Sequence, residues 1–106
     1  MIIEYNKLIR DRIPEIIEQS GKEFAIETMN EDEFQEALFA KLIEESIEAS
    51  ESGNTRLIKE IADILEVIDA ILINFEIEIK TVLDLKAKRR LERGGFEKKL
   101  KLLWTE

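Results

Sequence analysis

Hydrophobic residues recur at helical spacing through the middle of the chain. Phe34, Leu38 and Leu42 follow one another at four-residue steps, which places them on one face of a helix predicted over residues 31–50. The stripe continues to Glu45, three residues further on, and so changes from apolar to acidic. A face that is only solvated would not usually begin with hydrophobic side chains. The pattern therefore indicates a helix that carries carboxylates close to the protein's core.

The other predicted elements are also helical, because only one Pro and four Gly interrupt the 106 residues. Asn30 followed by Glu33 is typical of a capping box at the start of the 31–50 helix. The helix after the Gly53-Asn54 turn is hydrophobic almost all round, which favours a place in the centre of a bundle. We thus predict an all-α bundle of four to five helices in a single domain, residues 1–106. The first three expected helices span residues 13–20, 31–50 and 55–75. A fourth helix is expected to begin after a break near residues 74–78 and to end at Arg93. Residues 1–9 are expected to be extended, and residues 24–28 to form an extended link or a short strand.

Composition narrows the classes of function. The net charge is −8, so binding to a nucleic-acid polymer is not expected, because such binding needs a basic surface. The chain contains no Cys and no His, which excludes disulfides, thiol chemistry, His-based zinc sites and Ser-His triads. Its opening does not resemble a signal peptide, and no apolar run approaches the length of a membrane span. We therefore expect a cytoplasmic protein with no membrane partner.

Four carboxylates form two short repeats on neighbouring predicted helices. Glu45 and Glu48 are three residues apart on the first helix, and Glu60 and Asp63 are three apart on the second. Residues at this spacing share one helix face. If the helices fold back antiparallel across the Gly53-Asn54 turn, the two pairs can meet. Four converging carboxylates would repel one another unless a cation lay between them, and oxygen-only ligands suit a hard cation such as Mg²⁺.

Four sequence segments, taken in order, resemble one known superfamily. They are KLIEESIE at 41–48, EIAD at 60–63, NKLIRDRIP at 6–14 and RGGF at 93–96. The first two are similar to the KLxEExxE and ExxD signature of the all-α nucleotide pyrophosphohydrolases, which include MazG and phosphoribosyl-ATP pyrophosphohydrolase. The other two are similar to a small branch labelled phosphoribosyl-ATP pyrophosphohydrolase-like. The resemblance covers nearly the whole chain.

The resemblance implies a fold, a reaction and an assembly. It implies a MazG-like bundle that is completed by oligomerisation, as a homodimer or homotetramer. The implied enzyme uses Mg²⁺, or Mn²⁺ as a substitute, to cleave a nucleotide between its α and β phosphates and release pyrophosphate. Glu44 and Glu45 are the implied catalytic residues, Glu44 as a group that orients or deprotonates the attacking water. The implied metal ligands are Glu45, Glu48, Glu60 and Asp63.

A triphosphate also needs positive charge beyond the metal. The matching segments offer five cations, with Arg93 the strongest candidate because it adjoins the Gly94-Gly95 backbone. The set is Lys7, Arg10, Lys88, Arg89 and Arg93. A structural interpretation of Lys88, Arg89 and Arg93 is also open, because cations near the C-terminal end of a helix complement its dipole. Arg10 could equally belong to a structural ion-pair cluster with Asp11 and Arg12.

Several alternatives stay open at this stage. The substrate is undecided among phosphoribosyl-ATP, a noncanonical nucleotide and ordinary nucleoside triphosphates, and the NKLIRDRIP opening is not one that we associate with the histidine-pathway enzymes. A different class is a non-catalytic helical module that binds nucleotides or a partner. A carboxylate-bridged di-iron bundle ranks last, because that class uses Glu-x-x-His and the chain has no His.

Overall fold

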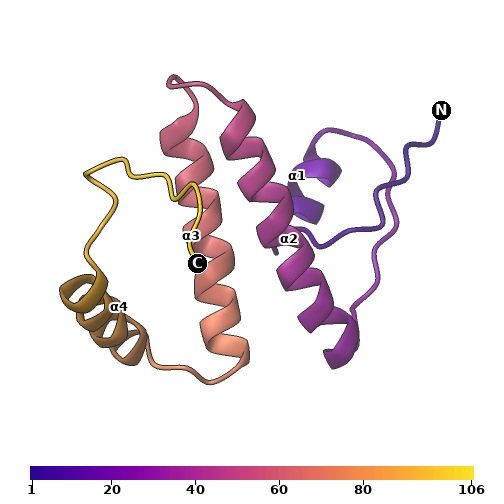
Figure 1. Ribbon diagram of the computed structural model, residues 1–106. Coiled ribbons are helices and arrows are strands. Elements are labelled where there is room, and N and C mark those ends of the chain that lie inside the picture. The colour runs from indigo at the N-terminus through magenta and orange to yellow at the C-terminus, as the bar shows by residue number, and fades with distance from the viewer.

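The computed structural model describes residues 1–106 and contains four helices and no β-strand (Figure 1). This confirms the all-α prediction, and the helix bounds agree with the expected ones to within about two residues. The segment at 24–28, for which a short strand was one prediction, is an irregular link. None of the four helices has the length and apolarity that crossing a bilayer requires. The helices are α1 (Ile13–Gln19), α2 (Glu31–Glu51), α3 (Leu57–Asn74) and α4 (Ile79–Arg93).

Local sequence signals account for where these helices begin and end. At the start of α2, the Asn30 side-chain oxygen accepts a hydrogen bond of 2.9 Å from the backbone N–H of Glu33, as the predicted cap requires. Pro14 lies in the first turn of α1, where its missing N–H costs nothing. Gly94 ends α4 with a φ of 83°, a backbone conformation that side chains disfavour, and its N–H bonds to the carbonyl oxygen of Arg90.

Helices α2 and α3 form an antiparallel hairpin, and their contact is the only extensive one between helices (Figure 1). Leu38 on α2 and Val67 on α3 are the two buried hydrophobic residues of the chain. The rings of Phe39 and Phe75 meet at the far end of the hairpin, with 5.9 Å between their centroids. The only other buried residues are two carboxylates, described below. The hairpin interface is therefore unusually acidic for its size.

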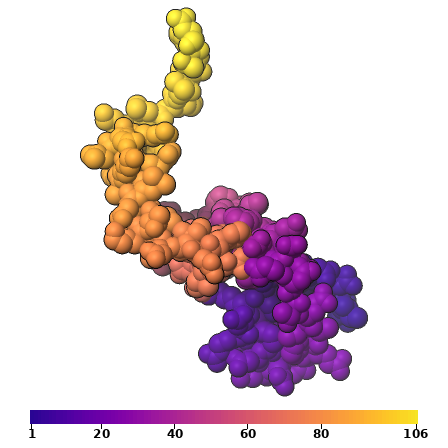
Figure 2. Space-filling model, turned by 90° about the horizontal axis from the view of Figure 1, so that it is seen from below, coloured from indigo at the N-terminus to yellow at the C-terminus, as the bar shows by residue number.

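The chain does not close into the bundle that the hydrophobic pattern of α3 predicts. Only α2 covers α3 within the chain, so Ile58 on another face of α3 keeps 85% of its surface exposed. The radius of gyration is 18.3 Å, whereas a compact domain of this length has one of about 13 Å. Figure 2 shows residues after α3 leading away from the rest of the molecule. Every residue from 75 to 106 is exposed.

Candidate metal site

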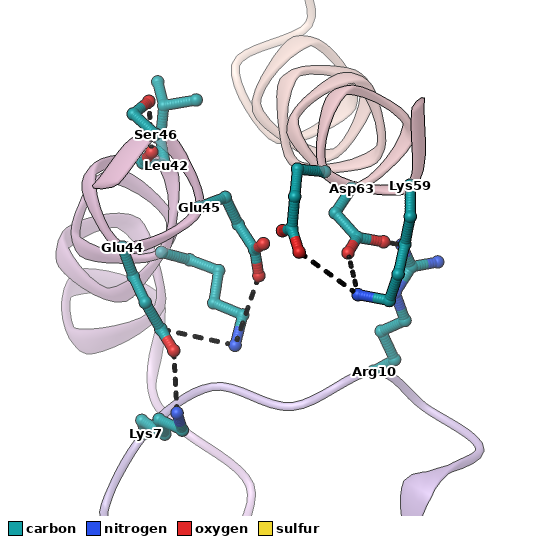
Figure 3. A network of polar contacts seen from close by, with 10 residues as sticks. Lys7, Arg10, Leu42, Glu44, Glu45, Ser46, Lys59 and Asp63 are labelled. Atoms are coloured by element: carbon teal, nitrogen blue, oxygen red, sulfur yellow. Dashed lines mark hydrogen bonds and ion pairs between the residues drawn. The ribbon is translucent and has the colours of Figure 1, made fainter. Parts of the chain in front are cut away.

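Three of the four predicted metal ligands meet between α2 and α3. Glu45 on α2 faces Glu60 and Asp63 on α3, and one carboxylate oxygen from each lies within 4.8 Å of the other two. Figure 3 shows Glu45 and Asp63 pointing towards the space between the two helices. The antiparallel hairpin thus brings together three of the four carboxylates that the two acidic repeats were predicted to bring together. We call Glu45, Glu60 and Asp63 the acidic cluster.

Two oxygens of this cluster have no partner. Glu45 is 8% exposed and Glu60 is 5% exposed, and the Oε2 atom of each is buried without a hydrogen bond. The nearest cations touch the other oxygens only loosely, with Lys41 Nζ 3.9 Å from Glu45 Oε1 and Lys59 Nζ 3.7 Å from Glu60 Oε1. Buried polar atoms are almost always satisfied in native proteins, because leaving one unpaired costs about 1–3 kcal/mol or more. The donor set, carboxylate oxygens alone, fits Mg²⁺ or Mn²⁺.

The electrostatics of the cluster are asymmetric. Burial raises the pKa of Glu45 above its ordinary value, and the nearby charges of Glu48 and Asp63 raise it further. The pKa of Asp63 is instead lowered, first by a hydrogen bond from Lys59 and then by Arg10. The pKa values of these two carboxylates are therefore shifted in opposite directions. A cation at the centre would favour the ionised form of both.

The N-terminal segment brings two predicted phosphate-binding cations to the edge of the cluster. Lys7 Nζ lies 2.7 Å from Glu44 Oε1, and Arg10 Nη2 lies 2.9 Å from Asp63 Oδ1 (Figure 3). The ion pair raises the pKa of Lys7, and the hydrogen bond from Lys7 lowers the pKa of Glu44. Lys7 therefore lies beside a candidate catalytic carboxylate, and Arg10 lies beside a candidate metal ligand.

Two further cations of this network had no role in the sequence interpretation. Lys41 Nζ lies 3.4 Å from Glu44 Oε2, and Lys59 Nζ lies 3.0 Å from Asp63 Oδ2. Lys41 and Lys59 precede Glu45 and Asp63 by four residues, so each shares a helix face with its acidic neighbour. That spacing was the signal that could have identified them.

Glu48, the fourth predicted ligand, lies outside the three-residue group. It is exposed on α2, one turn after Glu45, where its carboxylate is close enough to raise the pKa of Glu45. It borders an open hollow of about 380 Å³, which Glu60 of the cluster also lines. The hollow is lined by Glu48, Glu51, Ser52, Arg56, Lys59 and Glu60. Glu48 thus faces solvent beside the site.

The remaining predicted phosphate-binding residues are not brought to the cluster within one chain. Lys88, Arg89 and Arg93 are exposed on α4, which Figure 1 shows on the opposite side of α3 from α2. The one ion pair among them is internal to the helix, with Lys88 Nζ 3.8 Å from Glu92 Oε1. Any phosphate contact by these three residues at an acidic cluster would need a different arrangement of α4 or a second chain.

Comparison with known proteins adds little to this geometry. No protein-family model and no solved structure matches the chain. An uncharacterized protein of Mycolicibacterium smegmatis is 52% identical to it over 42 residues. That alignment covers 40% of this chain and 43% of the relative, so the chain matches less than half of the relative's length. The resemblance to nucleotide pyrophosphohydrolases therefore stays a prediction.

Proposed function

We propose that this chain is a Mg²⁺-dependent nucleotide pyrophosphohydrolase. The observation that carries the proposal is the pair of buried, unpartnered carboxylate oxygens of Glu45 and Glu60, which belong to a group of three carboxylates gathered between two helices. A merely structural hairpin would gain by replacing such groups with hydrophobic ones. The ordered motifs at 41–48 and 60–63 support the choice of reaction.

The ligands in this proposal are Glu45, Glu60 and Asp63, with Glu48 placed to join from the solvent side. When bound, Mg²⁺ (or Mn²⁺) would offset negative charge on the phosphates and make a nearby water more acidic. These residues would hold the ion while contributing no proton transfer of their own. Glu45, Glu60 and Asp63 converge between the two helices, and Glu48 is exposed beside them.

Glu44 is suited to deprotonate or orient the attacking water. The hydrogen bond from Lys7 lowers the pKa of Glu44 and so weakens it as a base, and release of Lys7 to a phosphate would remove that effect. In the reaction, the water oxygen bonds to the α phosphorus and the bond from that phosphorus to the bridging oxygen breaks. Pyrophosphate leaves, and a nucleoside monophosphate is the other product. Lys7 and Arg10 would exchange their carboxylate partners for phosphate oxygens of the substrate.

The proposed substrate is a nucleoside triphosphate or a molecule similar to phosphoribosyl-ATP. The proposed assembly is a homodimer or homotetramer. The small buried core of the single chain supports an assembly, because four buried residues are few for a domain of this length.

The deciding experiment is pyrophosphate release from a panel of nucleotides, phosphoribosyl-ATP included, in the presence of Mg²⁺. The test variant is Glu60→Gln with Asp63→Asn. The chain offers a matched control, Glu66→Gln with Asp69→Asn, which makes the same two changes at the same spacing on exposed positions of α3. We expect one substrate to yield pyrophosphate, with at least a thousandfold lower rate in the test variant and wild-type rates in the control.

Other results would redirect the proposal. Release of orthophosphate would show that a different bond is cleaved. Stoichiometric Mg²⁺ binding without turnover of any nucleotide would favour the non-catalytic module. Equal effects of the two double variants would remove the acidic cluster from the chemistry.

A further inference from the structure

We propose that a pocket between the N-terminal segment and α2 binds the base of the nucleotide, and that it favours bases with an exocyclic amino group, such as guanine and cytosine. The pocket has a volume of about 290 Å³, and Glu44 lines one end of it. It is called the N-terminal pocket. The inference rests on the proposed function and deepens it, because the acidic cluster does not determine which base the substrate carries.

The N-terminal pocket is formed by one face of α2 and by residues that precede this helix. Residues 6–8 and Met29 line it from outside the helix, and Figure 1 shows the N-terminal segment running beside α2. The lining residues of α2 recur at intervals of three or four, which places them on one side of the helix, away from the side that carries Leu38 and Glu45. These residues are Glu33, Glu36, Ala37, Ala40, Lys41 and Glu44.

One end of this pocket adjoins the acidic cluster. Lys41, which lines that end, places its Nζ 3.4 Å from Glu44 Oε2 and 3.9 Å from Glu45 Oε1. Glu36, towards the other end, precedes Glu45 by nine residues, which is about 14 Å along the helix axis. A nucleotide whose α phosphate is held at the cluster extends its sugar and base over a similar length. The base would therefore lie in the pocket while the phosphates stay outside it.

The size and the apolar part of the lining suit a flat ring. Pockets for small molecules have volumes of about 300 Å³ and more and combine apolar side chains with a few polar groups. At about 290 Å³, the N-terminal pocket fits part of a nucleotide. Its apolar side chains are those of Leu8, Met29, Ala37 and Ala40. The two alanines leave the space open, and the thioether of Met29 is suited to contact with an aromatic ring.

The polar groups far from the cluster favour a base that donates hydrogen bonds. Glu33 and Glu36 line the pocket with carboxylates, and an ionised carboxylate accepts hydrogen bonds but donates none. The backbone N–H of Glu33 is already bonded to Asn30. The amino groups of guanine, adenine and cytosine donate to such an acceptor. Uracil, thymine and hypoxanthine lack an amino group, and their carbonyl oxygens would instead meet negative charge.

The test compares nucleotides that differ at a single amino group. Equilibrium dialysis of the full chain in Mg²⁺ measures the dissociation constants of the monophosphates of guanosine, inosine, cytidine and uridine, which contain no pyrophosphate bond to cleave. We expect the guanosine compound to bind at least tenfold more tightly than the inosine compound, and the cytidine compound at least tenfold more tightly than the uridine compound. The corresponding triphosphates should show the same order in kcat/KM for pyrophosphate release.

A charge variant attributes the preference to the two carboxylates. Glu33→Gln with Glu36→Gln keeps the shape of both side chains and turns each into a group that donates as well as accepts. Both tenfold preferences should fall below threefold in this variant. The matched control is Glu66→Gln with Asp69→Asn, which removes two charges at the same spacing from exposed positions of α3 and should leave both preferences unchanged.

A second variant fills the pocket. Ala40→Phe places a ring in the space that the base would occupy, and should raise the dissociation constants of the guanosine and cytidine compounds at least tenfold. Ala87→Phe makes the same change at an exposed position of α4 and should alter them less than threefold. Circular dichroism shows whether Ala40→Phe keeps the helices. If it does not, the charge variant, which adds no bulk, decides the question.

Three results would overturn the inference. Equal binding within both pairs, or no binding of any of the four monophosphates, would exclude recognition of the amino group. A preference that survives in the charge variant would place its origin elsewhere, and wild-type binding by a folded Ala40→Phe would show that the base lies outside the pocket. Pyrophosphate release without a base preference would overturn this inference alone, whereas a preference in binding without pyrophosphate release would overturn the proposed reaction and leave the base site standing.

Discussion

Two regions of the chain, residues 1–78 (the body) and residues 79–106 (the arm), use hydrophobic and charged residues in opposite ways. In the body, two carboxylates take half of the buried positions and lie between helices without full hydrogen bonding. In the arm, large hydrophobic side chains are exposed and no charge is buried. Each region violates the usual rule that apolar groups lie inside and charges outside. In the body the exception is a group of converging carboxylates, and in the arm it is a set of exposed hydrophobic side chains.

Stability should depend far more on a body leucine than on an arm leucine. Leu38→Ala removes the most deeply buried side chain of the chain and should lower the free energy of unfolding by about 2–5 kcal/mol. Leu91→Ala makes the same change at a position on α4 that is 89% exposed, and should alter the free energy of unfolding by less than about 0.5 kcal/mol. Urea titration of both variants measures the difference. Equal losses would contradict the distinction between a packed body and an unpacked arm.

Mg²⁺ should stabilise the wild-type protein against unfolding, and this stabilisation should require the carboxylate of Glu45. At a Mg²⁺ concentration of one hundred times the dissociation constant, the free energy of unfolding should rise by about 2.7 kcal/mol. Glu45→Gln should abolish this increment, while in EDTA it should be at least as stable as the wild type, because it removes a buried charge. Thermal melts with and without Mg²⁺ make the comparison.

The matched control for that experiment is Glu51→Gln, an exposed position on the same helix. It should keep the full response to Mg²⁺. If Glu45→Gln destabilises the protein in EDTA, the carboxylate of Glu45 stabilises the metal-free fold. That result would argue against a cation as the partner of Glu45.

The free energy of unfolding of the metal-free protein should depend on pH through the titration of Glu45. Its pKa in the folded state is raised above the unfolded value, so the folded form binds the proton more tightly. Its contribution to stability is therefore fully present below the unfolded pKa of about 4.3 and is lost as pH rises through the folded pKa. The slope in this window should be reduced in Glu45→Gln. Unfolding free energies of both proteins between pH 4 and pH 8 provide the check.

Asp63 and Glu44 titrate in the opposite sense. Their pKa values are lowered by Lys59 and Lys7 respectively, so they contribute stability that is present above their unfolded pKa values and is lost as pH falls through the folded ones. The difference between wild type and Glu45→Gln isolates Glu45, because both proteins retain these two groups. A difference that grows towards low pH would contradict the assignment.

The sequence predicted the helices of this chain well and its tertiary packing less well. Helix bounds depend on local signals, such as the Asn30 cap and the Gly94 stop, and both work as expected. The meeting of Glu45 with Glu60 and Asp63 followed from helical spacing and one turn. The fully hydrophobic α3 predicted a bundle centre, but what covers a helix depends on other elements, and here only α2 does.

The same distinction explains which site residues could be placed. Lys7 and Arg10 lie in an irregular segment, where residue spacing does not predict which side chains come together. Only the resemblance implied that these two residues lie near the cluster. Lys41 and Lys59 were missed although their four-residue spacing was visible. The sequence correctly placed Lys88, Arg89 and Arg93 on a helix. All three are exposed there, and helical spacing alone does not predict what an exposed cation binds.

The smallest expected effect concerns the ion pair that ties the N-terminal segment to the body. Lys7 is 45% exposed, so its pair with Glu44 is screened by water, and Lys7→Met should lower the free energy of unfolding by no more than about 1 kcal/mol. Its effect on pyrophosphate release should be larger, roughly tenfold or more in kcat/KM, because a hydrogen-bonded cation that binds phosphate contributes about 1.5–3 kcal/mol. Lys22→Met, at an exposed position away from the network, is the control for charge alone and should leave both quantities unchanged. Loss of stability without loss of activity in Lys7→Met would show that Lys7 only ties the N-terminal segment to the rest of the chain. Loss of activity without loss of stability would show that Lys7 belongs to the substrate site.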